Sequence, residues 1–223
     1  MKKLLLILLC LPMIGFGQIC NSAYFDGIDD KITIEYPLVS NQPVPLDFPG
    51  AFTIEFWIKT NQSDPYPPYI IYKHPHDYST NTNAYGELIF AINNGFLTFR
   101  ATNYGSTHNS LISLNPINDS TWHHVAGVRD INDQMYLYID GVLVSQEIGC
   151  SGTVCEGPNP ITIGYYFDNT ISSYHFNGNL ENLRIWNKAL VQTEIQQNMN
   201  KCLINDSSLI LYYDFDEIVG WEF

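Results

Sequence analysis

The chain has 223 residues, of which 45% are hydrophobic and 15% are charged, and its formal net charge is −13. An acidic surface argues against binding to nucleic acid, whose phosphates require a basic face, but it is compatible with divalent cations and neutral sugars. Much of this charge can also serve only to keep the protein in solution.

The first 17 residues have the pattern of a cleaved signal peptide. Lys2 and Lys3 precede an apolar run over residues 4–11, and Gly15 and Gly17 place small residues before a cut at Gln18. The run is too short to cross a bilayer as a helix, so we expect a secreted, extracellular protein without a membrane span. Removal of the signal leaves about 206 residues with 8 basic against 23 acidic side chains, a net charge of −15. That length suits one domain, residues 18–223.

Apolar and polar residues alternate with a period of two through most of the remaining chain, first over residues 31–36 and 52–58. This alternation, with enrichment in Val, Ile, Tyr, Phe and Thr, is typical of half-buried strands. The further strands predicted on this basis cover residues 70–73, 87–92, 96–101, 122–129, 135–139, 142–148, 160–166, 180–186 and 209–215.

Turn residues separate these strands, and Asn93-Asn-Gly95 and Asp140-Gly141 are hairpin signals because Asn, Asp and Gly tolerate positive φ. One segment, residues 189–199, is predicted to be a helix with Leu190, Ile195 and Met199 on its inner side. Many strands with one short helix near the C-terminus predict an all-β, antiparallel sandwich of two packed sheets.

Two segments, residues 39–50 and 61–85, are long, irregular and rich in proline. Loops of this length inside a compact domain are usually functional or disordered. The second segment combines aromatic rings, which stack on the C–H faces of sugars, with groups that hydrogen-bond to hydroxyls. We therefore predict a ligand-binding patch there, with ordinary packing of single tyrosines as the alternative. Its residues are Tyr66, Tyr69, His74, His76, Tyr78 and Tyr85.

Four cysteines follow the signal, and an even number in an exported chain indicates disulfide bonds, with three pairings open. We favour a bond between Cys150 and Cys155, which are close in sequence. The remaining pair, Cys20 and Cys202, would join the chain ends if the first and last strands are neighbours. No CxxC or CxxH spacing supports the alternative of a zinc site.

Four stretches resemble the laminin-G-like, concanavalin-A-like jelly-roll family, to which pentraxin-related domains belong. Tyr24-Phe-Asp-Gly-Ile-Asp-Asp30 with residues 32–34 resembles the opening strand, and residues 52–58 resemble the second core strand. Thr121-Trp-His-His-Val, leading to the Tyr-Ile-Asp-Gly of residues 138–141, resembles the family's central hairpin. Residues 176–190 resemble its closing strand and the helix after it. The four stretches occur in the family's order within residues 21–217, so the resemblance implies a jelly roll.

The resemblance also implies Ca²⁺, because such domains often hold this ion with carboxylates, amides and backbone oxygens of loops. Asp168 and Asn169, followed by residues 176–178, are similar to the pentraxin stretch that carries acidic calcium ligands. Residues 83–90 resemble the partner stretch, but a Tyr-Gly pair replaces the usual Asp-Asn, so half of the expected ligand set is missing. Asp77 or Asn83 of the same loop would have to substitute.

Two other groups of residues invite a metal-binding interpretation. Asp26, Asp29 and Asp30 could form a second, structural cation site, although turn formation explains them better. His123 and His124 look like a ligand or catalytic pair, but adjacent strand residues point to opposite faces, so we predict a structural role for both.

Glycoside hydrolases of the same architecture are the catalytic alternative. Their retaining chemistry uses two carboxylates a few ångströms apart. In the hydrolases that this chain resembles, one strand with the motif Glu-x-Asp-x-Glu usually supplies both carboxylates. The sequence does not contain this motif. The strand glutamates are isolated from one another in sequence: Glu35, Glu55, Glu87, Glu147 and Glu181. A nucleophile elbow, a phosphate loop and an HExxH motif are also missing.

We therefore predict a secreted, non-catalytic recognition module whose ligand is a glycan, with assistance from calcium. A protein-binding adhesion module of the extracellular surface and a diverged glycoside hydrolase are the alternatives. The expected partner is a glycan or an extracellular protein, and not nucleic acid.

Overall fold

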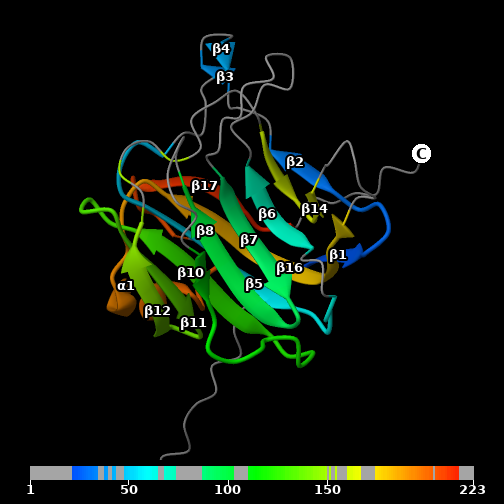
Figure 1. The fold of residues 1–223 in the computed structure, drawn as a ribbon. Helices are drawn as coiled ribbons and strands as arrows, with labels where there is room; N and C mark the ends of the chain where they lie inside the picture. The colour runs from blue at the N-terminus through cyan, green and yellow to red at the C-terminus, as the bar shows by residue number, and fades with distance from the viewer. Residues whose placement is uncertain are drawn as a thin grey trace, which may run out of the picture.

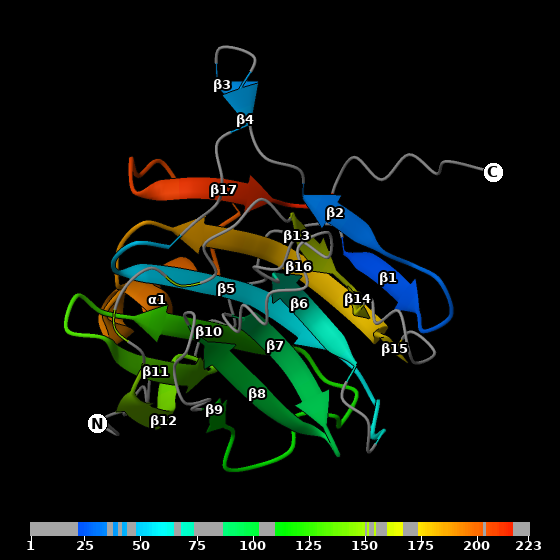
Figure 2. The same ribbon diagram turned by 45° about the horizontal axis from the view of Figure 1, so that its top comes forward.

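The computed structural model describes residues 22–34, 38–39, 42–43, 48–64, 68–73, 87–102, 110–149, 151, 154, 160–166, 174–202 and 204–215. Its strands form two main antiparallel sheets that pack face to face, and one short helix lies outside them (Figures 1 and 2). Among the described residues, no helix is long and apolar enough to span a membrane.

The larger sheet has seven strands in the order β1-β16-β5-β10-β11-β12, and β17 also pairs with β16. The bounds of these strands are β1 Ala23–Asp26, β5 Phe52–Lys59, β10 His123–Arg129, β11 Gln134–Ile139, β12 Val142–Ile148, β16 Asn177–Trp186 and β17 Leu209–Tyr213.

The smaller sheet has six strands in the order β2-β13-β6-β7-β8-β9. Its strands are β2 Ile32–Ile34, β6 Tyr69–Lys73, β7 Leu88–Asn93, β8 Phe96–Ala101, β9 Ser110–Ile112 and β13 Ile161–Ile163. Two short pairs lie outside the main sheets, β3 Leu38–Val39 with β4 Gln42–Pro43, and β14 Tyr165–Tyr166 with β15 Tyr174–His175. The two-sheet jelly-roll sandwich predicted from the sequence is confirmed.

The main core lies between the two sheets and follows the predicted alternation. Ile54, Phe56 and Ile58 of β5 point into it, and Phe56 meets Phe90 of β7 edge to face at 5.1 Å between ring centroids. Gly127 of β10 lets the Phe90 ring lie close to the backbone of β10, because a Cβ atom there would lie 2.6 Å from that ring. Burial of each such side chain stabilises the folded state by roughly 1.5–3 kcal/mol.

The predicted hairpins and strands are confirmed with local differences. Both residues of each two-residue turn have positive φ: Asn94 (50°) and Gly95 (86°) between β7 and β8, and Asp140 (51°) and Gly141 (71°) between β11 and β12. The strand predicted over residues 160–166 is split at Gly164, whose φ is 80° and whose Cβ would lie 2.5 Å from Phe25. Strand β9 was missed, because three residues are too short for an alternation signal.

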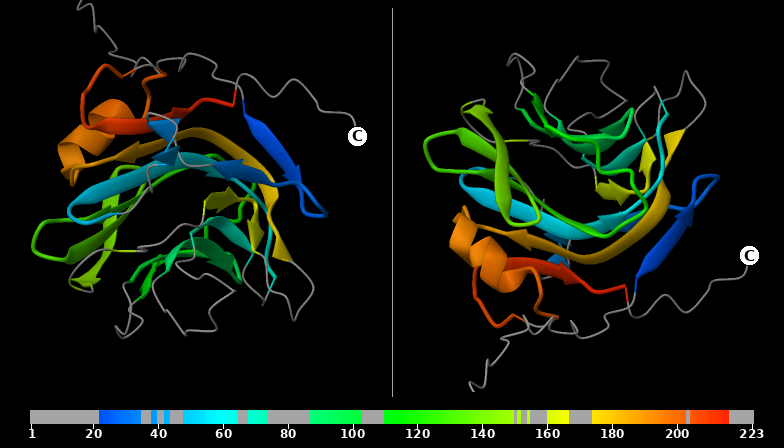
Figure 3. Two further views of the ribbon diagram at one scale, coloured as in Figure 1. Left: turned by 90° about the horizontal axis from the view of Figure 1, so that it is seen from above. Right: turned by 90° about the horizontal axis from the view of Figure 1, so that it is seen from below.

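Helix α1 (Gln192–Asn198) lies on the outer face of the seven-stranded sheet, on the opposite side of the molecule from β6–β9 (Figure 3). It encloses a second small core with Trp186, Leu190 and Ile195. The prediction that the helix begins at residue 189 was wrong. Thr53 holds the preceding residues outside the helix, since its hydroxyl donates to the Lys188 carbonyl at 2.8 Å and accepts from the Leu190 N–H at 2.9 Å.

Candidate functional site

The outer face of the six-stranded sheet holds the described part of the predicted ligand-binding patch. Strands β6, β7 and β8 alternate between the core and this face, and their register aligns side chains in two rows across the sheet. The first row is Tyr72, Ile89, Arg100 and Ser110, and the second is Tyr69, Ala91, Thr98 and Ile112. The six strands contain two charged residues, Lys73 and Arg100, and Lys73 is completely buried. Arg100 is therefore the charged group that these strands present outward.

Arg100 is held by an acidic and a hydroxyl side chain. Its Nη1 donates to Glu87 Oε2 at 2.9 Å, and its Nε donates to Ser110 Oγ at 2.9 Å. Glu87, just before β7, is fixed through its backbone, because its N–H donates to Thr102 Oγ1 and its carbonyl accepts from the Thr102 N–H. The side chains of Arg100 and Glu87 are 29% and 20% exposed, so a ligand can reach both. We call these two residues the Glu87–Arg100 pair.

Two tyrosine rings lie on the same face. Tyr69 is half-buried and Tyr72 is buried, and their ring centroids are 5.2 Å apart. Burial raises the pKa of Tyr69, and the negative charge of Glu87 raises it further while Arg100 opposes the rise. The Tyr69 hydroxyl is therefore neutral at physiological pH, and it lies within the electrostatic reach of the Glu87–Arg100 pair.

Of the predicted ligand-binding residues, Tyr69 lies within the described ranges. The others, Tyr66, His74, His76, Tyr78 and Tyr85, and the predicted calcium ligands Asp77, Asn83, Asp168 and Asn169, lie outside the described residues. Sequence reasoning missed Arg100 and Ser110 as site residues, although the alternation of residues 96–101 places Arg100 on the same face as Thr98.

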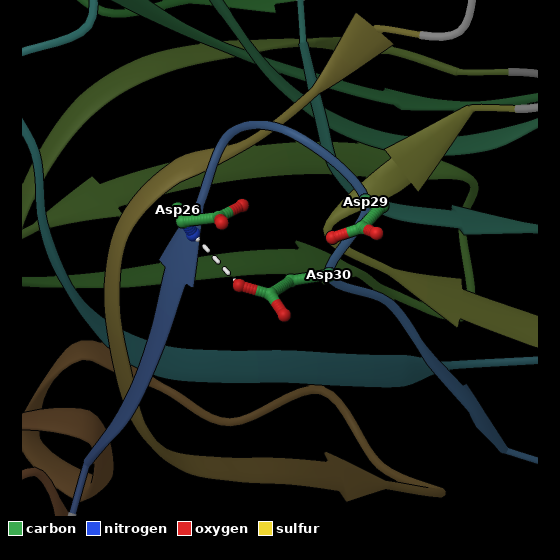
Figure 4. Close-up of side chains that lie close together, drawn as sticks. All are labelled: Asp26, Asp29 and Asp30. Atoms are coloured by element: carbon green, nitrogen blue, oxygen red, sulfur yellow. Dashed lines mark hydrogen bonds between the residues drawn. The ribbon is translucent and has the colours of Figure 1, made fainter. Parts of the chain in front are cut away.

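Asp26, Asp29 and Asp30, for which the sequence favoured turn formation over a cation site, lie in a tight turn between β1 and β2 (Figure 4). Carboxylate oxygens of Asp26, Asp29 and Asp30 all lie within 4.8 Å of one another. Asp30 Oδ2 accepts from the Asp26 N–H at 2.8 Å, and Asp26 Oδ1 accepts from the Ile28 N–H at 2.7 Å. These hydrogen bonds show that Asp26 and Asp30 stabilise the turn. The other carboxylate oxygens of the three aspartates are of the kind that binds Ca²⁺ in proteins.

His124 of the adjacent histidine pair belongs to a buried ionic cluster beneath α1. His124, Glu55 and Arg184 are all completely buried. Glu55 Oε2 lies 3.4 Å from His124 Nε2, and Glu55 Oε1 lies 3.3 Å from Arg184 Nη1 and 3.2 Å from Trp186 Nε1. The carboxylate of Glu55 is therefore inaccessible to a glycan, and its surroundings indicate a structural role.

His123 points to the other side of β10, as predicted from strand geometry. Its Nδ1 lies 2.9 Å from Asp140 Oδ2, and its Nε2 lies 3.2 Å from Thr121 Oγ1 and 3.3 Å from Asp119 Oδ1. This resembles a hydroxyl–imidazole–carboxylate triad, but the Thr121 hydroxyl donates to Asp119 Oδ1 at 2.7 Å. Because that proton is directed away from the imidazole, the arrangement does not prepare Thr121 as a nucleophile.

Cys202 is disulfide-bonded. Its favoured partner, Cys20, lies outside the described residues, as do Cys150 and Cys155, so both pairings stay predictions.

Several solved structures share this fold. One is a Bacteroides ovatus protein described as a candidate carbohydrate-binding protein, with 18% identity and a TM-score of 0.62 over 89% of this chain and 53% of that one. The chain thus spans about half the length of that protein. Another is the native heptameric SAP-like pentraxin of Limulus polyphemus, with 16% identity and a TM-score of 0.57 over 81% of this chain and 82% of that one.

A third is the CBM40 domain of the Ruminococcus gnavus IT-sialidase bound to alpha2,3 sialyllactose, with 16% identity and a TM-score of 0.57 over 80% of this chain and 97% of that one. At these identities the similarity shows the fold alone. No curated protein matches the sequence. A family model matches residues 26–196, which is more than half of the chain. The protein therefore belongs to the concanavalin A-like lectin/glucanases superfamily.

Proposed function

We propose that the protein is a non-catalytic carbohydrate-binding module and that the outer face of its six-stranded sheet is the binding face. The observation that carries this proposal is the Tyr69 ring on the same face as the Glu87–Arg100 pair. A sugar ring has apolar C–H faces that pack on an aromatic side chain. Its hydroxyls both donate and accept hydrogen bonds, and Arg100 and Glu87 offer a donor and an acceptor side by side.

Two structural neighbours support the class of ligand. The Bacteroides ovatus protein is described as a candidate carbohydrate-binding protein, and the CBM40 domain is described as bound to a sialylated sugar. Their descriptions make a glycan the first ligand class to test for a chain of the same fold, while the site on this chain has to be argued from its own residues.

Binding is favoured over catalysis by the state of the described glutamates. Hydrolysis of a glycosidic bond requires two carboxyl groups that face the same sugar. Glu55 is completely buried, and the described carboxylate on the outer face of the six-stranded sheet, Glu87, forms an ion pair with Arg100.

Calcium assistance and an extracellular location remain parts of this proposal. The signal-peptide pattern of residues 1–17 supports export, and Asp77, Asn83, Asp168 and Asn169 are the proposed calcium ligands. Titration calorimetry and thermal unfolding of the mature chain with Ca²⁺ test whether the protein binds calcium. We expect heat and a higher unfolding temperature at millimolar calcium; their absence would remove calcium from the proposal.

A glycan array of the mature chain, run with calcium and again with EDTA, tests the function. We expect binding that falls by about tenfold or more in the Tyr69→Ala variant, since stacking residues at the centre of a site carry much of the affinity. Tyr24→Ala is the matched control, because Tyr24 is 62% exposed and lies on β1 of the other sheet. Silence of the wild-type chain under both conditions would refute glycan binding and favour an extracellular protein as the partner.

A further inference from the structure

We propose that the Glu87–Arg100 pair makes the binding face selective for neutral glycans over glycans that carry carboxylate or sulfate groups. This inference rests on the carbohydrate-binding function proposed above and specifies its ligand class.

The charge of Arg100 is already matched by Glu87. The two side chains meet at 2.9 Å, and Ser110 holds Arg100 from the other side. The strands of this sheet present no other exposed charge within the described residues, because Lys73 is buried. An anionic group that approaches Arg100 must also approach the Glu87 carboxylate, and the net charge of −13 adds a weaker repulsion from the rest of the chain.

A neutral sugar fits the same pair better. The contacts within the described residues engage two of the five N–H donors of Arg100 and one carboxylate oxygen of Glu87. One hydroxyl can accept from the guanidinium while its neighbour donates to the second oxygen of Glu87. A carboxylate or sulfate group on a sugar has only acceptor atoms, so it can satisfy Arg100 but leaves Glu87 facing like charge.

The backbone around the pair keeps this arrangement in place. Glu87 and Thr102 exchange two hydrogen bonds, both of 2.9 Å, and Arg100 pairs directly with Ser110 in the β8–β9 register. Because the positions are set by the sheet, the balance between donor and acceptor does not depend on ligand binding. A site fixed in this way rejects the wrong ligand by leaving charged groups unmatched.

The experiment compares the mature chain with its Glu87→Gln variant on neutral glucan and xylan oligosaccharides, oligogalacturonate and sialyllactose. Glutamine keeps the size and an acceptor oxygen but removes the charge, so Arg100 becomes an uncompensated cation. We expect the wild type to prefer the neutral probes, and the ratio of anionic to neutral binding to rise by about tenfold or more in the variant. Glu147→Gln is the control, because it makes the same charge change on the exposed strand β12 of the other sheet.

The outcomes separate the two proposals. Stronger or equal binding of the anionic probes by the wild type would overturn the selectivity and leave glycan binding intact. No binding of any probe by the wild type or by Glu87→Gln would overturn the binding function itself. An equal shift in Glu87→Gln and Glu147→Gln would assign the effect to total charge and overturn the role of the pair.

The wild type provides a test that needs no variant. Its affinity for the anionic probe sialyllactose should not fall between low and physiological salt, because the pair offers an anion no net positive charge that salt could screen. A steep loss of affinity with salt would contradict a charge-balanced site.

Discussion

The substitution Glu55→Gln tests how the protein holds its C-terminal helix against the seven-stranded sheet. Glu55 is completely buried between His124 and Arg184, and its Oε1 also accepts from Trp186 Nε1 at 3.2 Å. Arg184 in turn donates to the carbonyls of Asn198 and Lys201, at and just beyond the end of α1. Glu55 is thus the counter-ion of the side chain that binds the C-terminal end of the helix.

The expected loss is large because a buried charge is left without its partner. Removal of one member of a buried ion pair costs about 3–5 kcal/mol. Glutamine preserves the volume of the side chain and the acceptor for Trp186, so no cavity forms that would add to the loss of stability. Arg184 keeps its two carbonyl contacts and lies 5.6 Å from the centroid of the Tyr212 ring, which compensates part of its charge. We therefore expect a loss near the lower limit, about 3 kcal/mol.

Equilibrium unfolding in urea measures this loss. The matched control is Glu147→Gln, which removes a carboxylate from an exposed position on β12 and should change stability by less than about 0.5 kcal/mol. A loss below about 1 kcal/mol for Glu55→Gln would refute the argument, since it would mean that Arg184 does not need the charge of Glu55. Unequal m-values for the two chains would instead indicate a changed unfolded or native state.

The stabilities of the wild type and of Glu55→Gln should also depend differently on pH. Burial alone would raise the pKa of Glu55, but its interactions with the nearby His124 and Arg184 outweigh burial and hold the pKa below its ordinary value of 4.5. The stability that this depression provides is complete above about pH 4.5 and is lost as the pH falls through the folded-state pKa. The difference in unfolding free energy between wild type and Glu55→Gln should therefore shrink below pH 4.5. A difference that stays constant through acid pH would contradict this assignment.

Two further predictions concern the backbone. Gly127→Ala should cost about 1–3 kcal/mol in urea unfolding, because its Cβ would lie 2.6 Å from Phe90 and 2.7 Å from Phe99; an unchanged midpoint would show that the rings move aside. Asn182 has a φ of 53° at the bulge of β16. Asn182→Val should therefore be less stable than Asn182→Gly by about 1–2 kcal/mol, and equal thermal unfolding of the two variants would argue against a fixed left-handed conformation.

Most of the sandwich could be predicted from the sequence because each strand carries its own signal. Alternation places Ile54, Phe56 and Ile58 on one side of β5, and the same pattern holds in β7 and β8. Turn residues fix the two tight hairpins because few residue types tolerate positive φ. These signals are local, and the two-sheet arrangement follows from the need to bury the apolar faces against each other.

Features that depend on distant residues could not be predicted in this way. The start of α1 is set by Thr53, which lies more than a hundred positions earlier in the chain. The bulge of β16 at Asn182 shifts its alternation, so that Leu180 and Leu183 both face the main core. Glu87 and Arg100 each look like isolated strand charges in the sequence, and they become a pair only through the β7–β8 register.

The proposed binding face lies on the sheet whose outer charged groups are partly exposed. On the outer side of the seven-stranded sheet, α1 packs over Trp186, and Glu55, His124 and Arg184 are buried beneath it. These three side chains interact with one another or with the fold and cannot contact a ligand. On the six-stranded sheet, the Glu87–Arg100 pair keeps partial exposure and unused donors and acceptors. A ligand that needs fixed polar groups beside an aromatic ring therefore finds them on the six-stranded sheet, and the Tyr69→Ala and Glu87→Gln variants probe its stacking and its charge separately.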